Sequence, residues 1–317
     1  MLQVKNLAVS FGLEKPLSGV TFDVRNGETL GIVGESGSGK SLTAMSVMGL
    51  LPLIGGRITS GSISFDEQDL TKLSDQDYRK LRGGRISLIT QNPMTSLDPL
   101  KRIGGQIDVV GRLHMSLSKA DARKRTIDIL GRLRIPDPAL ICERYPHQMS
   151  GGMKQRIVIA MALAANPSVI LADEPTTALD VTVQAQIIQI LNGLVREQNL
   201  ALVLITHDMS VVAQACDKVV VMYAGRVVEQ GPVAAIFGHP QHPYTRALID
   251  CIPRSLTEGA RLRGIEGTVP SVLNYPSGCP FHPRCARAEA VCGSTIPPLV
   301  AAGQTAVACH FPVETTS

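Results

Sequence analysis

The sequence predicts an α/β fold, and three observations support that prediction. A glycine-rich loop at residues 34–41 stands between a strand-like apolar run and a segment of helical character. Another apolar run ends in two adjacent carboxylates, Asp173 and Glu174. Short apolar runs of strand length, such as residues 200–206, alternate with helix-like stretches along much of the chain.

The bulk properties narrow the class of protein. The chain has 317 residues, enough for one or two domains, and its net charge of +4 is too weak to indicate a nucleic-acid partner. Mean hydropathy is +0.14, yet no uninterrupted apolar run approaches the roughly 18 residues of a membrane span. The first residues lack the charged start and apolar block of a secretory signal. We therefore expect a cytosolic chain whose seven cysteines are reduced.

The N-terminal part is predicted to be rich in β-structure. A turn at Asn26-Gly27 precedes a strand at residues 29–33, which leads directly into the glycine-rich loop. Further strands are expected at residues 61–65 and 85–90, and the second of these ends at Gln91. The apolar positions of the first strand are Leu2, Val4, Leu7 and Val9.

Residues 93–150 change to a helical pattern. Helices are expected at residues 104–113 and 119–133, and prolines at 136 and 138 end the second. Its apolar face would carry Ile127, Leu130 and Leu133.

The remaining α/β elements follow residue 168. A strand at 168–172 is followed by a helix, a strand at 201–205 and a hairpin of residues 218–222 and 226–229. The apolar stripe of that helix consists of Ile187, Ile190, Leu191 and Leu194. Beyond Pro232 the pattern weakens into a proline-rich, loop-rich tail.

The glycine-rich loop predicts a phosphate-binding site. Glycines let backbone N–H groups turn inward around an anion, and the following helix presents the positive end of its dipole. Lys40 would reach the β- and γ-phosphates of a nucleotide, and Ser41 would supply an oxygen to Mg²⁺. The phosphate-loop residues are Gly34, Glu35, Ser36, Gly37, Ser38, Gly39, Lys40 and Ser41.

The two carboxylates after the strand at 168–172 fit the same chemistry. Asp173 would hold Mg²⁺, and Glu174 would orient or deprotonate the water that attacks the γ-phosphate. The competing interpretation is an acidic helix cap after an ordinary strand.

One further stretch gives a family resemblance. Residues 149–156 read Met-Ser-Gly-Gly-Met-Lys-Gln-Arg and lie just upstream of the strand that ends in Asp173. This order of motifs resembles the ATP-binding cassette (ABC) ATPases. The resemblance implies a P-loop cassette with a RecA-like core, an antiparallel β part and a helical subdomain at about residues 93–155. It also implies that Ser150, Gly151 and Gly152 complete the ATP site of a second cassette, so that the protein works as one half of a pair.

Four more features match this family pattern. Gln91 resembles the Q-loop glutamine that senses Mg²⁺, the γ-phosphate and the transmembrane partner. His207 resembles the switch histidine that touches the γ-phosphate, and residues 177–180 resemble the D-loop at the dimer interface. Phe11 matches the aromatic residue that stacks on adenine, where the family usually has Tyr, and a plain core role is the alternative.

Two segments narrow the resemblance to one branch. Residues 90–99 are similar to the extended Q-loop of peptide importers, and residues 238–245 resemble the His-Pro-Tyr segment of oligopeptide, dipeptide and nickel importer ATPases. Met149 and Met153 replace the usual Leu and Gln of the Ser-Gly-Gly motif, and Met153 is similar to this branch. The resemblance implies a nucleotide-binding domain at residues 1–235 and a C-terminal extension at 236–317.

The implied function is ATP hydrolysis that powers uptake of dipeptides or oligopeptides. The implied partners are two transmembrane permease subunits, a second and non-identical ABC ATPase, and an extracytoplasmic substrate-binding protein. The chain would sit on the cytoplasmic face of the membrane. Nickel, glutathione or antimicrobial peptides are alternative cargoes, and a soluble ABC ATPase of translation or DNA repair is the alternative class.

Four cysteines in the tail form a separate candidate site. Cys279, Cys285, Cys292 and Cys309 are spaced C-x5-C-x6-C-x16-C, which matches neither a zinc finger nor a common ferredoxin. Four thiols in a segment with little core indicate a metal staple. Residues 278–285 resemble the tail of dipeptide and oligopeptide importer ATPases, which implies a [4Fe-4S] cluster. Zinc and free thiols are the alternatives.

Overall fold

The computed structural model describes residues 1–177, 179–252 and 264–313. Two compact units divide the chain. One comprises Met1–Val24, Thr29–Thr71 and Leu204–Ser317, and the other comprises Arg25–Glu28 and Lys72–Val203. The predicted division at residue 235 does not coincide with this partition and stays a prediction.

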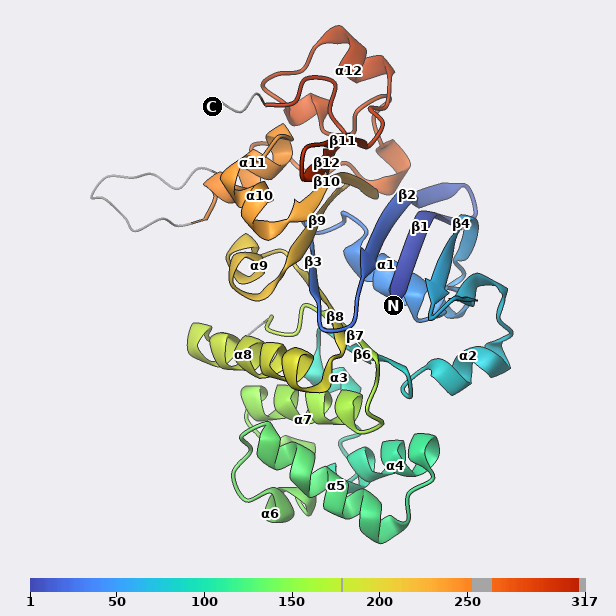
Figure 1. Cartoon of the computed structure of the whole chain (residues 1–317), viewed down its shortest axis with the longest axis vertical. Coiled ribbons are helices and arrows are strands. Elements are labelled where there is room, and N and C mark those ends of the chain that lie inside the picture. The colour runs from blue at the N-terminus through green and yellow to red at the C-terminus, as the bar shows by residue number, and fades with distance from the viewer. Residues whose placement is uncertain (178, 253–263, 314–317) are drawn as a thin grey trace, which may run out of the picture. The chain divides into compact units, whose positions relative to one another are not determined.

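The first unit contains the predicted antiparallel β part. Its sheet has the order β2-β1-β4-β5, and Figure 1 shows β2, β1 and β4 side by side with α1 next to them. The strands are β1 (Leu2–Phe11), β2 (Glu14–Val24), β4 (Arg57–Phe65) and β5 (Gln68–Asp69).

A bulge in β1 explains its apolar pattern. Val4 and Leu7 are both fully buried although they are three residues apart, which in a regular strand would place them on opposite faces. The pairing register shifts between these two residues, and Asn6 has a φ of 47°. The extra residue turns the side chain of Leu7 back toward the core. The predicted core positions of this strand are therefore all buried.

The second sheet segment of the first unit carries the phosphate loop. Its strands follow the order β11-β12-β10-β9-β3, in which β3 runs parallel to β9 and β10 pairs antiparallel with β9. The strands are β3 (Thr29–Val33), β9 (Lys218–Tyr223), β10 (Arg226–Pro232), β11 (Val300–Ala302) and β12 (Thr305–Val307). The helices are α1 (Lys40–Val47), α9 (Met209–Ala215), α10 (Val233–Gly238), α11 (Pro243–Asp250) and α12 (Ala290–Ser294).

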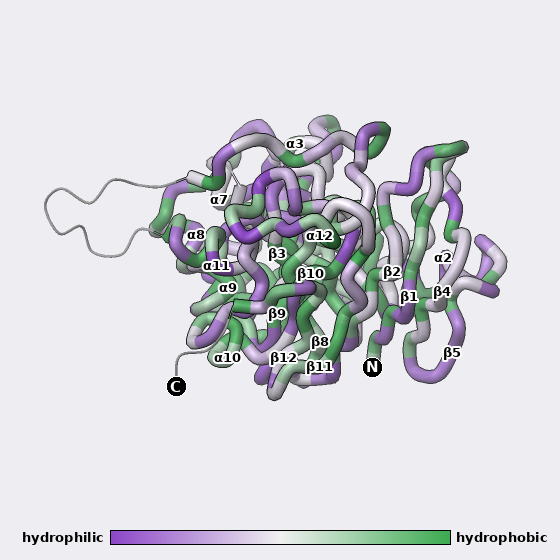
Figure 2. Tube along the Cα trace, turned by 90° about the horizontal axis from the view of Figure 1, so that it is seen from above, coloured by the Kyte–Doolittle hydropathy of each residue, from purple (hydrophilic) through white to green (hydrophobic). Residues whose placement is uncertain are grey.

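The C-terminal tail shares a core with these strands. Figure 2 shows that the chain around β3 and β9 is mostly hydrophobic, while the turn before β5 is hydrophilic. One buried cluster unites Val33 at the end of β3 and Tyr223 at the end of β9 with Tyr244 and Phe281 from the tail. The tail therefore packs on the sheet that positions the phosphate loop.

The second unit contains a short parallel strand pair and the helical region. Residues Ile86 to Ile89 of β6 pair in parallel with Val169 to Ala172 of β7. The strands are β6 (Ile86–Ile89) and β7 (Val169–Asp173), and β8 (Ala201–Thr206) leads back into the first unit. The helices are α2 (Asp75–Leu81), α3 (Pro93–Ser96), α4 (Ile103–Met115), α5 (Lys119–Arg132), α6 (Pro138–Cys142), α7 (Gly151–Leu163) and α8 (Val181–Gln198).

The helical subdomain is built on α4 to α7, which lie together in Figure 1. The predicted face of α5 needs a correction, because Ile127 is only half-buried while Ile129 is buried beside Leu130. The predicted apolar stripe of α8 is confirmed, since Ile187, Ile190, Leu191 and Leu194 are all buried. None of the helices described by the structure is long and apolar enough to cross a membrane.

Candidate nucleotide site

The phosphate loop follows β3 and ends at α1, as the sequence predicts. Gly34 lies so close to β9 that a Cβ there would stand 2.2 Å from the carbonyl oxygen of Met222. Gly39 has a left-handed φ of 98°, and a Cβ there would stand 2.4 Å from a methyl carbon of Leu17. Both positions therefore require glycine for the loop to fit its surroundings.

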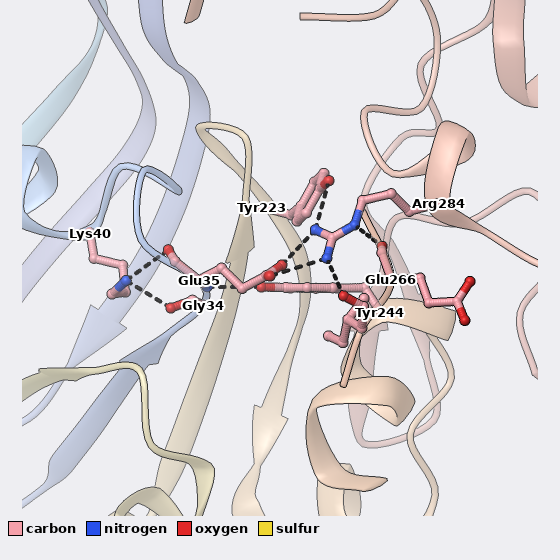
Figure 3. A network of polar contacts seen from close by, with 8 residues as sticks. Gly34, Glu35, Lys40, Tyr223, Tyr244, Glu266 and Arg284 are labelled. Atoms are coloured by element: carbon pink, nitrogen blue, oxygen red, sulfur yellow. Dashed lines mark hydrogen bonds and ion pairs between the residues drawn. The ribbon is translucent and has the colours of Figure 1, made fainter. Parts of the chain in front are cut away.

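Lys40 closes the loop on itself. Its side chain is buried, and Nζ donates to the carbonyl oxygens of Gly34 at 2.7 Å and Glu35 at 3.0 Å (Figure 3). Ser41 is exposed on the first turn of α1. A cation and a helix N-terminus at one loop form the arrangement that binds phosphate groups.

The sequence did not lead us to two contacts between this loop and the tail. Arg284 forms an ion pair with the carboxylate of Glu35, and the Glu35 N–H donates to the hydroxyl of Tyr244 at 2.9 Å. Both tail residues lie inside motifs of the branch, the His-Pro-Tyr segment and the segment from Cys279 to Cys285. Those two motifs single out Tyr244 and Arg284 in the sequence, but they do not indicate that these residues contact the phosphate loop.

The second unit brings two predicted catalytic residues together. Because β6 and β7 are parallel, their carboxyl ends lie at the same edge, and Gln91 and Glu174 each follow one of these ends. The Gln91 amide donates to Glu174 Oε2 at 2.8 Å, and the Thr177 hydroxyl donates to the same oxygen at 2.8 Å. Glu174 has a φ of 46°, a conformation that non-glycine residues adopt mainly where structure or function requires it. Asp173 is the last residue of β7.

The Ser-Gly-Gly element forms the N-terminus of α7. The Ser150 hydroxyl accepts the N–H of Met153 at 3.3 Å as an N-cap. A Cβ at Gly152 would stand 2.9 Å from a methyl carbon of Val183 in α8, so the motif packs tightly against that helix. The role of Ser150, Gly151 and Gly152 at a partner's nucleotide stays a prediction.

The D-loop leads into α8. Asp180 caps this helix by accepting the N–H of Val183 at 2.9 Å. Ala178 of the predicted D-loop lies outside the described residues.

Two more predicted site residues belong to the first unit. His207 is exposed and directly follows β8, where Asp208 caps α9. Phe11 ends β1 and is half-buried, and its ring lies against Gly56, where a Cβ would stand 2.7 Å from the ring. Their contacts with a nucleotide stay predictions.

The four tail cysteines gather around one cavity. Cys279, Cys285, Cys292 and Cys309 all line it, together with His282, His310 and five other neighbouring residues. All four are free thiols. Burial raises the pKa of Cys279 and Cys285, and it raises the pKa of Cys309 to about 11.

The cysteine cavity has the donor set of a metal site without the arrangement of one. Four thiols facing one space fit the ligands of an iron–sulfur cluster in kind and number. Over residues 1–177, 179–252 and 264–313, however, no group of three or more His, Cys, Asp or Glu side chains is placed to hold a metal ion. The predicted cluster is thus not confirmed by the geometry.

Two family models match the chain. The model for ABC transporters matches residues 17–177, and the model for the C-terminal region of oligopeptide/dipeptide transporters matches residues 228–292. Dipeptide transport ATP-binding protein DppD of Bacillus subtilis is 48% identical over 301 residues, covering 94% of this chain and 90% of DppD. Oligopeptide transport ATP-binding protein OppD of Salmonella typhimurium is 47% identical over 319 residues, covering 99% of this chain and 94% of OppD.

A solved structure supports the fold. The dimeric ATP-binding cassette MJ0796, in a post-hydrolysis state with ADP and Pi, matches with a TM-score of 0.66 and 29% identity, covering 74% of this chain and 99% of MJ0796. Together with the loop and strand-end geometry, these similarities identify the fold and the ATPase activity. This chain belongs to the ABC transporter ATPases, in the branch that carries the oligopeptide/dipeptide transporter C-terminal region.

Proposed function

We propose that this chain hydrolyses ATP to power the uptake of dipeptides or oligopeptides through separate membrane permease subunits. One observation carries the proposal: an ABC cassette and the peptide-transporter C-terminal region occur in the same chain, and its similarity to peptide-transport ATPases covers nearly its full length. The partners would be two permeases, a second ABC ATPase of related sequence and an extracytoplasmic binding protein. The chain would act at the cytoplasmic face of the membrane.

The phosphate loop would bind ATP. Backbone N–H groups of residues 34–41 other than that of Glu35, together with the Lys40 ammonium, would hold the β- and γ-phosphates. Mg²⁺, when bound, would neutralise charge that develops on the phosphates. Ser41 and Asp173 would hold that ion directly or through water, and Gln91 would contact it as the site closes.

Glu174 would activate the attacking water. The hydrogen bonds from Gln91 and Thr177 to its Oε2 hold the carboxylate in place, and a carboxylate held in this way can accept a proton from water. Gln91 would thereby link the Q-loop, residues 90–99, to the general base Glu174. His207 would contact the γ-phosphate, and the partner's Ser-Gly-Gly element would close over it.

Substitution of Glu174 tests this mechanism. In Glu174→Gln the amide keeps the shape of the side chain but cannot take a proton, so ATP should still bind while turnover falls about 100- to 1000-fold. Phosphate release by the assembled transporter gives the rate, and light scattering with ATP should show a persistent closed dimer. The matched control is Glu197→Gln, because Glu197 is exposed in α8 and pairs only with Arg132 among the contacts we observe. Turnover of the Glu174 variant at the control rate would remove Glu174 from this role.

The cargo can be tested in the same preparation. Dipeptides and oligopeptides should be taken up, with ATP consumption, by vesicles that contain the permeases, the binding protein and both ATPases. Uptake of nickel, glutathione or an antimicrobial peptide in place of these peptides would reassign the substrate. Co-purification with ribosomes or DNA, and with no permease, would overturn the transport function.

We propose further that the four tail cysteines hold a [4Fe-4S] cluster. Support comes from their shared cavity and from the chemistry of the set, since four cysteines are the usual ligands of this cluster. The cluster would act as a staple for a segment that has little core of its own. Anaerobically purified protein should then contain about four irons per chain and absorb in the visible range, and Cys285→Ser should lose both. Stoichiometric zinc, or fully titratable thiols without metal, would refute the cluster.

A further inference from the structure

The tail holds one residue of the phosphate loop from outside the loop. Glu35 is bound at three points: its carboxylate by Arg284, its N–H by the Tyr244 hydroxyl, and its carbonyl by Lys40 (Figure 3). The guanidinium contacts both carboxylate oxygens, with Nη1 to Oε2 at 2.7 Å and Nη2 to Oε1 at 3.1 Å. Side chain and backbone of Glu35 are therefore fixed together.

Arg284 is itself fully engaged. Its side chain is only 5% exposed, whereas that of Glu35 is 29% exposed. Beyond Glu35, the guanidinium donates to the carbonyl oxygens of Glu266 and Ile265 and to the hydroxyl of Tyr223, at 2.8, 3.1 and 3.3 Å. All five N–H donors of the guanidinium thus have an acceptor, which leaves Arg284 one orientation, toward the loop.

Tyr244 is equally fixed. Its ring is fully buried and lies 4.7 Å from the ring of Tyr223 and 5.2 Å from that of Phe281, measured between centroids. The hydroxyl that receives the Glu35 N–H therefore sits on a rigid aromatic cluster. Because that N–H donates to Tyr244, the tail fixes the direction of one backbone N–H group of the phosphate loop.

We propose that Arg284 and Tyr244 are positioning residues of the nucleotide site, which hold Glu35 so that the phosphate loop is shaped for ATP before ATP arrives. This inference rests on the proposed role of residues 34–41 as the phosphate loop. The hydrogen bonds of both residues to the phosphate loop are made to Glu35, so they act on the site through that residue. A preformed loop binds the phosphates of ATP and of the transition state alike, so its loss should raise KM and leave kcat nearly unchanged.

Two variants and two matched controls test the inference. Arg284→Gln removes the ion pair, and Tyr244→Phe removes the hydroxyl while keeping the ring. The control for the first is Arg287→Gln, an exposed arginine three residues along the same segment. The control for the second is Tyr275→Phe, because the Tyr275 hydroxyl is buried with no hydrogen-bond partner among the described residues.

The measurements are the Kd of a fluorescent ATP analogue for the whole chain, and KM and kcat for ATP in the assembled transporter. We expect the Kd to rise about tenfold in Arg284→Gln, equivalent to about 1.4 kcal/mol. A smaller rise of about threefold is expected in Tyr244→Phe. KM should rise in parallel while kcat stays within twofold, and Arg284→Lys should recover part of the affinity because it keeps the charge without the two-point contact.

Kd values within twofold of the two controls would overturn the inference. If Arg284→Gln fails to fold, by circular dichroism and thermal unfolding, Tyr244→Phe decides the matter because it preserves the packing of the aromatic cluster. Lys40→Ala tests separately whether residues 34–41 bind the nucleotide at all. Unchanged nucleotide binding in Lys40→Ala would refute the phosphate loop itself, whereas lost binding there with normal Tyr244→Phe and Arg284→Gln refutes only the role of the tail.

Discussion

Among single residues, Glu229 shows how the tail is attached to the sheet. It lies in β10 with no exposed surface and accepts the N–H groups of Gln241 at 2.8 Å and His242 at 3.0 Å, just before α11 begins. Burial raises the pKa of Glu229, against the opposing effect of these hydrogen bonds. Burial also lowers the pKa of the neighbouring His242 to about 3, so this ring is neutral at physiological pH.

The raised pKa predicts how stability depends on pH. Above the unfolded pKa, about 4.3 for a glutamate, the native state keeps a proton on Glu229 that the unfolded chain loses. The contribution of Glu229 to the free energy of unfolding is therefore largest below that pKa and declines as the pH rises through the folded pKa. Urea unfolding of the native protein and of Glu229→Gln from pH 4.5 to 8 should show the variant gaining relative stability with pH. His242 titrates in both proteins and cancels in the difference, so a constant difference would contradict the prediction.

At the scale of elements, the sequence predicts what depends on local pattern. The apolar stripe of α8 and the turn of Ala224-Gly225, where both residues have positive φ, follow from periodicity and turn chemistry. The meeting of Gln91 and Glu174 also follows, because residues after neighbouring parallel strands share one edge of a sheet. These features depend on short-range rules that the sequence carries.

Other features of the elements depend on packing and could not be predicted. The three-residue step from Val4 to Leu7 breaks the apolar alternation, but it does not by itself say that the extra residue forms a bulge at Asn6. The buried face of α5 was misplaced around Ile127, because periodicity alone does not fix where the centre of an apolar face lies. Arg284 and Glu35 are 249 residues apart, and an exposed and a buried arginine look the same in a sequence.

For the whole molecule, the proposed assembly predicts that Ser150 acts on ATP turnover at the nucleotide site of the partner ATPase. If two cassettes face each other, Ser150→Arg should impair turnover at the site whose phosphate loop belongs to the partner, while nucleotide binding by this chain alone is unchanged. Phosphate release should be measured in a transporter whose own-site base is disabled by Glu174→Gln, so that only the partner's loop turns over. Ser118→Arg is the matched control, because Ser118 also caps a helix, α5, through the N–H of Asp121. Equal losses in both variants would reduce Ser150 to a helix cap.

The ion pair between Glu35 and Arg284 also affects whether C-terminal regions can be exchanged between two such ATPases. A chimaera that joins the front of one ATPase to the tail of another would receive each partner from a different parent. An unmatched arginine would then be left in a nearly closed site, where an uncompensated charge is costly. We therefore expect an exchange of C-terminal regions between two such ATPases to succeed only where the residues at positions 35 and 284 still match each other.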